Sequence, residues 1–136
     1  MALDYPRHPW IKLDCAPVFL LGYPTGQEKG YFEDLGKMYA VLLAWLKSTP
    51  CRHVTIADLR RLKSTAKGRQ MATDFYTQTV AFEGRYLLGC AYVTAGEQNR
   101  HAITAVSWGA GSGIPKVFFD NPQEAIVWAQ ARINER

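Results

Sequence analysis

The sequence has no apolar run long enough to cross a membrane. Its longest uninterrupted apolar stretch, Met38–Leu46, has nine residues, and another apolar block is Ala16–Leu21. A transmembrane helix needs about 20 apolar residues. The first ten residues, MALDYPRHPW, also lack the charged, apolar and small-residue regions of a secretory signal. We therefore predict no transmembrane segment and a cytoplasmic protein.

Cysteine and histidine are scarce, and neither residue type forms a recognised pattern. The three cysteines are Cys15, Cys51 and Cys90. An odd number without CxxC spacing fits neither a disulfide framework nor a zinc site, and buried reduced thiols are expected. The three histidines are His8, His53 and His101. None has an i,i+4 partner or an HExxH context, so we predict no metal and no cofactor.

Sequence motifs of catalysis are also missing. The glycine-containing stretches Gly22–Gly26 and Gly109–Gly113 lack the Gly-Lys-Ser/Thr ending of a P-loop, and both are typical of turns. A cysteine–histidine pair formed in space, for example by Cys51 or Cys90 with His53, stays an alternative. Because a cysteine in a strand is usually a small core residue, we predict that the chain is not an enzyme.

The charge balance is only mildly basic. Sixteen lysines and arginines are mixed with twelve acidic residues, which gives a net charge of +4. This bias falls short of a nucleic-acid-binding signature, and no nucleic acid is expected. With 136 residues and 48% hydrophobic composition, the chain predicts a single domain over residues 1–136.

The first half of the chain predicts two strands, a helix and a third strand. Strands are expected near residues 10–13 and 18–23, with the first at the edge of the sheet because it alternates apolar and charged residues. Apolar residues at three- and four-residue steps predict a helix over 27–47. The β-branched run 53–59 is typical of a buried parallel strand.

The second half predicts a further helix, then two strand–helix units. Ser64 or Thr65 can cap a helix that reaches about Phe82. Its expected inner face consists of Met71, Ala72, Phe75, Val80 and Phe82. A strand over 86–93 precedes a capping box at 94–97 and a helix carrying Ala102, Ile103 and Val106. The strand 116–119 then leads to a last helix, which Asn121 caps, with Pro122 at its first position.

Together these elements predict an α/β fold with the order ββαβαβαβα. We expect a single-layer, mixed but mainly parallel five-stranded sheet with about four helices, because strands that alternate with helices are joined by crossovers over the sheet faces. Several aromatic residues should pack between the helices and the sheet: Tyr31, Tyr39, Trp45, Phe75, Phe82, Trp108 and Trp128.

Three local strings, HVTIADL, RYLLGCAYV and PKVFFDNPQEAIVWAQ, resemble the SpoIIAA-like, or STAS-like, bacterial proteins from about residue 11 to residue 133. The resemblance implies a non-catalytic regulatory module that binds proteins, as anti-sigma-factor antagonists do. Those proteins carry an Asp-Leu at a strand end and, farther on, an Asp-Ser-Ser-Gly loop with a phosphorylated serine. Here Asp58–Leu59 supplies the first, but the second string is missing, so Ser64 and Thr65 match the phosphorylation site only loosely. Relatives of the family also resemble the CRAL-TRIO lipid-binding fold, which implies the alternative of a lipid or other apolar small molecule.

The densest charge cluster follows the strand at 53–59. We predict that it binds an acidic partner or an anion through Asp58, Arg60, Arg61, Lys63, Lys67 and Arg69. Ligands of open α/β sheets bind where a strand's carboxyl end meets a helix N-terminus, and the helix N–H groups there favour anions. Phosphorylation of Ser64 or Thr65 would add about −2 charge beside these cations. The simpler interpretation is a solvated loop in which Ser64 or Thr65 merely caps the helix.

A second candidate site is an apolar pocket lined by Phe75, Tyr76 and Trp108, although ordinary core packing explains such aromatic residues equally well. We rank a protein partner first and a lipid or apolar small molecule second. Homodimerisation is a further hypothesis, because an edge strand and aromatic surface need cover.

Overall fold

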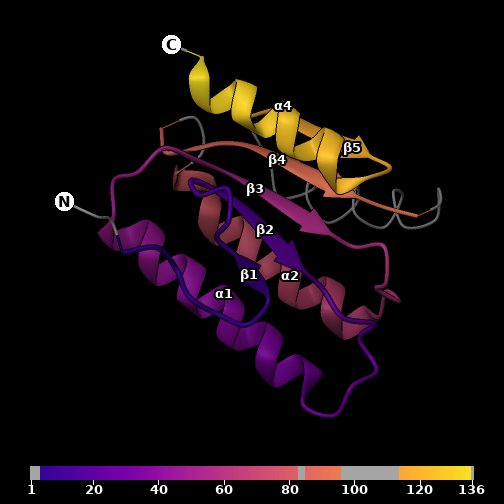
Figure 1. The fold of residues 1–136 in the computed structure, drawn as a ribbon. Helices are drawn as coiled ribbons and strands as arrows, with labels where there is room; N and C mark the ends of the chain where they lie inside the picture. Colours follow the sequence, from indigo (N-terminus) through magenta and orange to yellow (C-terminus); the bar gives the residue numbers. More distant parts are fainter. Residues whose placement is uncertain (1–3, 83–84, 96–113, 136) are drawn as a thin grey trace.

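The computed structural model describes residues 4–82, 85–95 and 114–135, and one five-stranded sheet runs through them (Figure 1). The strands are β1 (Ile11–Lys12), β2 (Val18–Gly22), β3 (His53–Asp58), β4 (Leu87–Val93) and β5 (Lys116–Phe119), in this spatial order. Strand β1 is antiparallel to β2, whereas all other neighbours are parallel. The mixed, mainly parallel sheet and the edge position of the first strand are confirmed.

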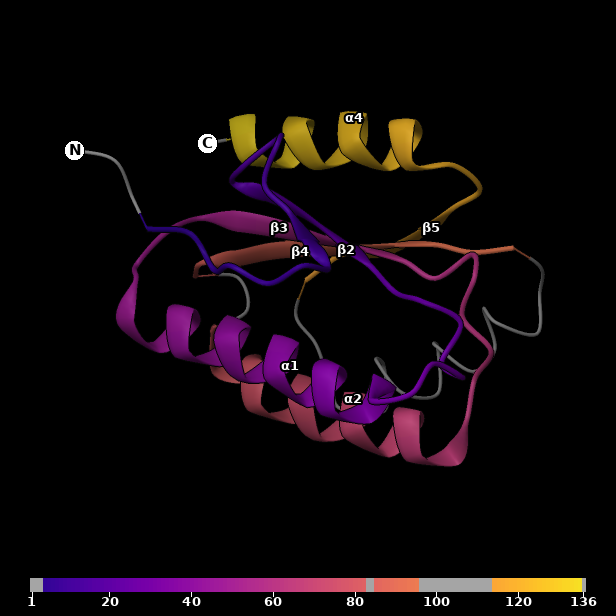
Figure 2. The same ribbon diagram turned by 60° about the horizontal axis from the view of Figure 1, so that its bottom comes forward.

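Helices cover both faces of the sheet. They are α1 (Tyr31–Ser48), α2 (Ala66–Thr79) followed by the short 3-10 turn η1 (Val80–Phe82), and α4 (Pro122–Asn134). Figure 2 shows α4 on one side of the sheet and α1 and α2 on the other. The described part of the chain thus contains three α-helices. The helix expected after the 94–97 capping box, the Gly109–Gly113 loop and Trp108 lie outside the described residues.

The sheet has a hydrophobic core on each face, and the alternation of residues along β3 explains how they are divided between the two. Alternate residues of a strand point to opposite faces, and Val54 and Ile56 accordingly join the cluster under α4. Ala57 and the following Leu59 join the cluster under α1 and α2. Strand β4 is buried along its whole length, as expected for a central parallel strand with helices on both faces. No helix within residues 4–82, 85–95 and 114–135 is long and apolar enough to span a membrane.

Most of the aromatic residues expected between helices and sheet are found there. Tyr31, Tyr39, Trp45 and Phe75 are buried, whereas Phe82 and Trp128 are half-buried beside the two cores. The last helix begins as predicted, because the Asn121 side chain accepts a hydrogen bond from the Glu124 N–H at 2.9 Å and Pro122 occupies its first turn.

Two details of the prediction are corrected. Val80, expected on the inner face of its helix, is 38% exposed, whereas Thr79 is 1% exposed. The α-helix ends at Thr79 and tightens into η1, and the changed angular step turns Val80 outward. The expectation of three buried thiols holds only for Cys90, because Cys15 and Cys51 are half-buried. Both lie beside strands rather than inside them.

Candidate functional site

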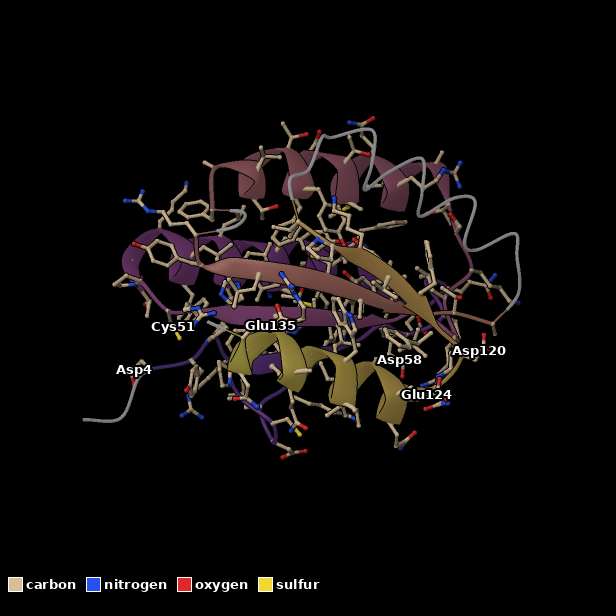
Figure 3. All side chains as sticks on the ribbon, turned by 90° about the horizontal axis from the view of Figure 1, so that it is seen from above. Asp4, Cys51, Asp58, Asp120, Glu124 and Glu135 are labelled. Carbon is tan, nitrogen blue, oxygen red and sulfur yellow. The ribbon has the colours of Figure 1, made fainter. Side chains whose placement is uncertain are left out.

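A cavity of about 70 Å³ opens at the carboxyl ends of the parallel strands, on the face covered by α1 and α2. Ala57 of β3, Tyr92 of β4 and Tyr23, which follows β2, form its sheet side. This end of the sheet is visible in Figure 3, where Asp58 marks the last residue of β3. Open α/β sheets bind ligands in this position, which makes the cavity the first candidate site.

Tyrosine dominates the cavity wall. Five tyrosines line it: Tyr23, Tyr31, Tyr39, Tyr76 and Tyr92. Between them lie the aliphatic side chains Leu35, Ala57, Leu59, Leu62 and Ala72. The rest of the lining comes from the β3–α2 loop and the first turn of α2: Lys63, Ser64, Thr65, Gly68 and Arg69. Lys63, Ser64 and Arg69 are exposed, so the site combines an aromatic interior with a basic mouth.

The tyrosine hydroxyls in this interior are uncharged. The Tyr23 and Tyr39 hydroxyls form a hydrogen bond of 3.1 Å, and each residue is 7% exposed. Burial raises the pKa of Tyr23 well above its ordinary value, and the neighbouring Tyr39 raises it further. Burial likewise raises the pKa of Tyr76, with a contribution from Tyr92. For Tyr31, burial and the charge of Glu28 raise the pKa to about 12.

The Tyr23–Tyr39 pair carries a hydrogen-bond donor in excess. Each phenol has one O–H proton, and the bond between the two hydroxyls uses only one of the pair's two protons. Within the described part of the chain, no acceptor for the second proton is found. A buried donor without an acceptor costs free energy. A molecule that enters the cavity therefore binds more tightly if it carries an oxygen atom that accepts this hydrogen bond.

The basic loop is held in place by backbone hydrogen bonds to neighbouring elements. The Leu59 N–H donates to the Val93 carbonyl at 2.8 Å, and the Lys63 N–H donates to the Thr25 carbonyl at 2.8 Å. Gly26 makes this approach possible, because its φ is +95° and a Cβ atom there would lie 3.3 Å from the Lys63 carbonyl oxygen. The β2–α1 loop therefore supports the mouth of the cavity.

The two candidate hydroxyls play different parts in this loop. Thr65 caps α2, since its hydroxyl oxygen accepts a hydrogen bond from the Gly68 N–H at 3.1 Å. Ser64 is exposed, and its hydroxyl oxygen accepts a hydrogen bond from Arg69 Nη1 at 2.8 Å. Capping by Thr65 agrees with the simpler interpretation of the loop, and phosphorylation of either residue stays a prediction.

The charged residues predicted for this site divide into two groups. Asp58 and Arg60 engage each other, with Arg60 Nε at 2.9 Å and Nη2 at 2.8 Å from the carboxylate oxygens. Burial alone would raise the pKa of Asp58, but the hydrogen bonds and charge of Arg60 outweigh it and hold the pKa below its ordinary value. The other four cations, Arg61, Lys63, Lys67 and Arg69, are exposed. Only Lys63 and Arg69 line the cavity, whereas Lys67 lies 4.7 Å over the Phe32 ring.

The three residues predicted for an apolar pocket lie in different places. Tyr76 lines the cavity. Phe75 does not, because its ring stacks on Tyr39 with the centroids 4.3 Å apart. Trp108 is outside the described residues. Tyr23 and Tyr92 were not among the predicted site residues. Each stands at the carboxyl end of a predicted strand, and that position is the sequence signal that points to them.

The cysteine–histidine alternative gains no support from the geometry. His53 Nδ1 donates to the Cys51 carbonyl at 2.9 Å instead of contacting the thiol. Burial raises the pKa of the Cys51 thiol, and burial lowers the pKa of His53 to about 4. A protonated thiol beside a ring held by the backbone is not an activated nucleophile. Among residues 4–82, 85–95 and 114–135, no group of three or more His, Cys, Asp or Glu side chains is arranged to hold a metal ion.

Comparison with known proteins gives a match at the level of structure. No protein-family model matches the sequence, and no curated protein matches it. The structure is similar to the crystal structure of an uncharacterized protein of the DUF3478 family from Shewanella loihica PV-4, described as having a SpoIIAA-like fold. The similarity has a TM-score of 0.56, covers 82% of each chain and comes with 18% sequence identity. The expected SpoIIAA-like α/β fold is therefore confirmed, whereas the expected fourth helix lies outside the described residues.

Proposed function

We propose that this protein is a non-catalytic regulatory module whose β3–α2 loop binds an acidic segment of another protein. The observation that carries this proposal is the set of four exposed cations, Arg61, Lys63, Lys67 and Arg69, none of which forms an ion pair with a described residue. Cations whose charge is not neutralised by an ion pair attract negative surfaces and set the orientation of a partner during encounter.

The surroundings of the loop favour binding over turnover. The loop is fixed by the Lys63–Thr25 and Leu59–Val93 backbone hydrogen bonds, so its cations are presented on a rigid base. The N-terminus of α2, which carries the positive end of the helix dipole, directly follows this loop at Ala66. The SpoIIAA-like fold is compatible with such a module, and its regulatory role is part of the proposal.

The test compares two charge-reversal variants of equal charge. Lys63→Glu/Arg69→Glu alters the loop, and Arg7→Glu/Lys47→Glu alters exposed cations away from it. Proteins bound by each immobilised variant in extracts of the native host are quantified against the unchanged protein at low and high salt. We expect a salt-sensitive protein partner that the loop variant loses and the control variant keeps. Equal retention by both variants, or equal loss, refutes the proposal.

The cavity itself favours a second candidate function, the binding of a small molecule. A cavity of about 150 Å³ is known to hold one benzene ring, whereas the cavity here measures about 70 Å³. A whole lipid chain does not fit into this volume. The small-molecule alternative therefore narrows to compounds of a few heavy atoms, part of which stay at the mouth.

A further inference from the structure

We infer that the tyrosine-lined cavity is a binding site for a short monocarboxylate, about four to six carbons long, that carries a second, uncharged oxygen atom on its chain. The inference goes beyond the proposed protein-binding role, because the ligand binds to the isolated chain. It rests on the charge of the cavity mouth, the volume of the cavity and the excess phenolic donor.

The cations at the mouth of the cavity determine where the carboxylate of the ligand lies. Lys63 and Arg69 are the charged residues that line the cavity, and both are exposed. Arg69 is already oriented by its hydrogen bond to Ser64 at 2.8 Å, and its guanidinium has further N–H donors for a carboxylate. A carboxylate at this position stays partly hydrated and pairs with two cations, whereas a carboxylate pushed among the tyrosines would lose its hydration.

The interior determines the length of the ligand. If about 150 Å³ holds the six carbons of benzene, the 70 Å³ here has room for roughly three heavy atoms in the same proportion. The carboxylate and one or two more carbons then occupy the mouth. This limit separates the proposed ligand from a fatty acid or a phospholipid, whose chains are several times longer.

The Tyr23–Tyr39 pair is the reason why the ligand carries a second oxygen atom. Tyr23 and Tyr39 are each 7% exposed, and their shared hydrogen bond leaves one O–H proton unused. A plain alkyl chain would cover this donor without satisfying it, which costs affinity. A keto or hydroxyl oxygen on the chain accepts the proton. The preferred ligand is therefore an oxo- or hydroxy-substituted short carboxylate.

The experiment titrates the isolated protein with 4-oxopentanoate, pentanoate, 2-pentanone and decanoate, following binding by calorimetry and by NMR of tyrosine-labelled protein. We expect 4-oxopentanoate to bind most tightly and to shift cavity tyrosine signals. Pentanoate should bind roughly fivefold more weakly because it lacks the acceptor. Loss of the charge in 2-pentanone should cost roughly tenfold or more. Decanoate should bind no more tightly than pentanoate, because its longer chain does not fit into the cavity.

Four variants separate this site from general anion binding. Arg69→Ala should weaken 4-oxopentanoate binding roughly tenfold, whereas Arg7→Ala removes an equal, exposed charge away from the cavity and the basic loop and should change nothing. Tyr23→Phe/Tyr39→Phe keeps both rings and should abolish the preference for 4-oxopentanoate over pentanoate. Ala72→Leu, which adds bulk to the cavity wall, should block binding while the thermal transition is preserved.

Three outcomes overturn the inference. If the tyrosine NMR signals do not shift with up to about 50 mM 4-oxopentanoate, which is about ten times a weak millimolar Kd, the cavity stays empty or holds only water. Equal effects of Arg69→Ala and Arg7→Ala show nonspecific attraction of anions. Tighter binding of decanoate than of 4-oxopentanoate shows a lipid site instead. None of these results depends on a protein partner, so they leave the proposed function to its own test.

Discussion

His53 makes the stability of this protein sensitive to mildly acidic pH. The residue is 2% exposed, and its ring contacts Phe19 and Trp45 at centroid distances of 5.6 and 4.9 Å. Burial disfavours the charged ring and lowers its pKa from 6.5 to about 4, although the hydrogen bond to the Cys51 carbonyl opposes this shift. The unfolded chain therefore takes up a proton at a higher pH than the folded chain does.

The sign and size of the effect follow from these two pKa values. Above pH 6.5 the His53 ring is neutral in both the folded and the unfolded chain, and its full contribution to stability is present. As the pH falls from 6.5 to 4, the free energy of unfolding decreases by about 1.4 kcal/mol per pH unit, or about 3 kcal/mol in total. Between pH 7 and pH 5 the expected loss is about 2 kcal/mol.

Urea denaturation at pH 7 and pH 5 measures this loss directly. The matched variant is His53→Gln, whose amide can still donate to the Cys51 carbonyl but does not titrate. Carboxylates with lowered pKa values, such as Asp58, contribute equally to both proteins, so the difference between them isolates His53. The NMR titration of the His53 ring in the unchanged protein gives a second reading that needs no variant. A ring that titrates near pH 6.5, or equal pH dependence in both proteins, refutes the reasoning.

Three further predictions concern positions that shape the fold and the site. Gly89→Ala places a Cβ atom 2.8 Å from Trp128 Cη2, and it should lower the free energy of unfolding by about 1–3 kcal/mol in urea. Its control, Gly36→Ala in α1, meets Met71 Cε at an ordinary 3.6 Å, and should stabilise by about 0.5–1 kcal/mol; a destabilised control would contradict this. Thr65→Ala removes the cap of α2 and should cost about 1 kcal/mol by the same assay, with Thr65→Ser close to the unchanged protein. Gly26→Ala strains a residue at φ +95° and should cost about 1 kcal/mol or more in thermal unfolding, and an unchanged transition would show that the loop accommodates a side chain.

The tyrosine cavity and the basic loop meet although they come from separate parts of the chain. Tyr23 and Lys63 lie forty residues apart in sequence, and the parallel pairing of β2 with β3 brings their strand ends together. The same pairing places the Thr25 carbonyl under the Lys63 N–H. A change in the β2–α1 loop is therefore expected to alter the mouth of the cavity.

Local sequence signals were sufficient for most of the elements and for their order in the described residues. The Asn121–Pro122 start of α4, the buried character of β4 and the edge position of β1 all follow from short-range rules about caps, apolar runs and alternation. The position of the basic loop after Asp58 was predicted for the same reason. These features depend on neighbours in sequence, which a single chain displays directly.

Only the tertiary structure decided which side chains share a site. Tyr23 and Tyr92 are ordinary strand-end residues in the sequence, and their common cavity results from the register of β2, β3 and β4. Likewise, Asp58 and Arg60 were grouped with the free cations but neutralise each other, and Val80 turns outward where α2 tightens. Burial, unused donors and cavity volume arise from contacts between distant segments, so they are properties of the packed fold and not of any local pattern.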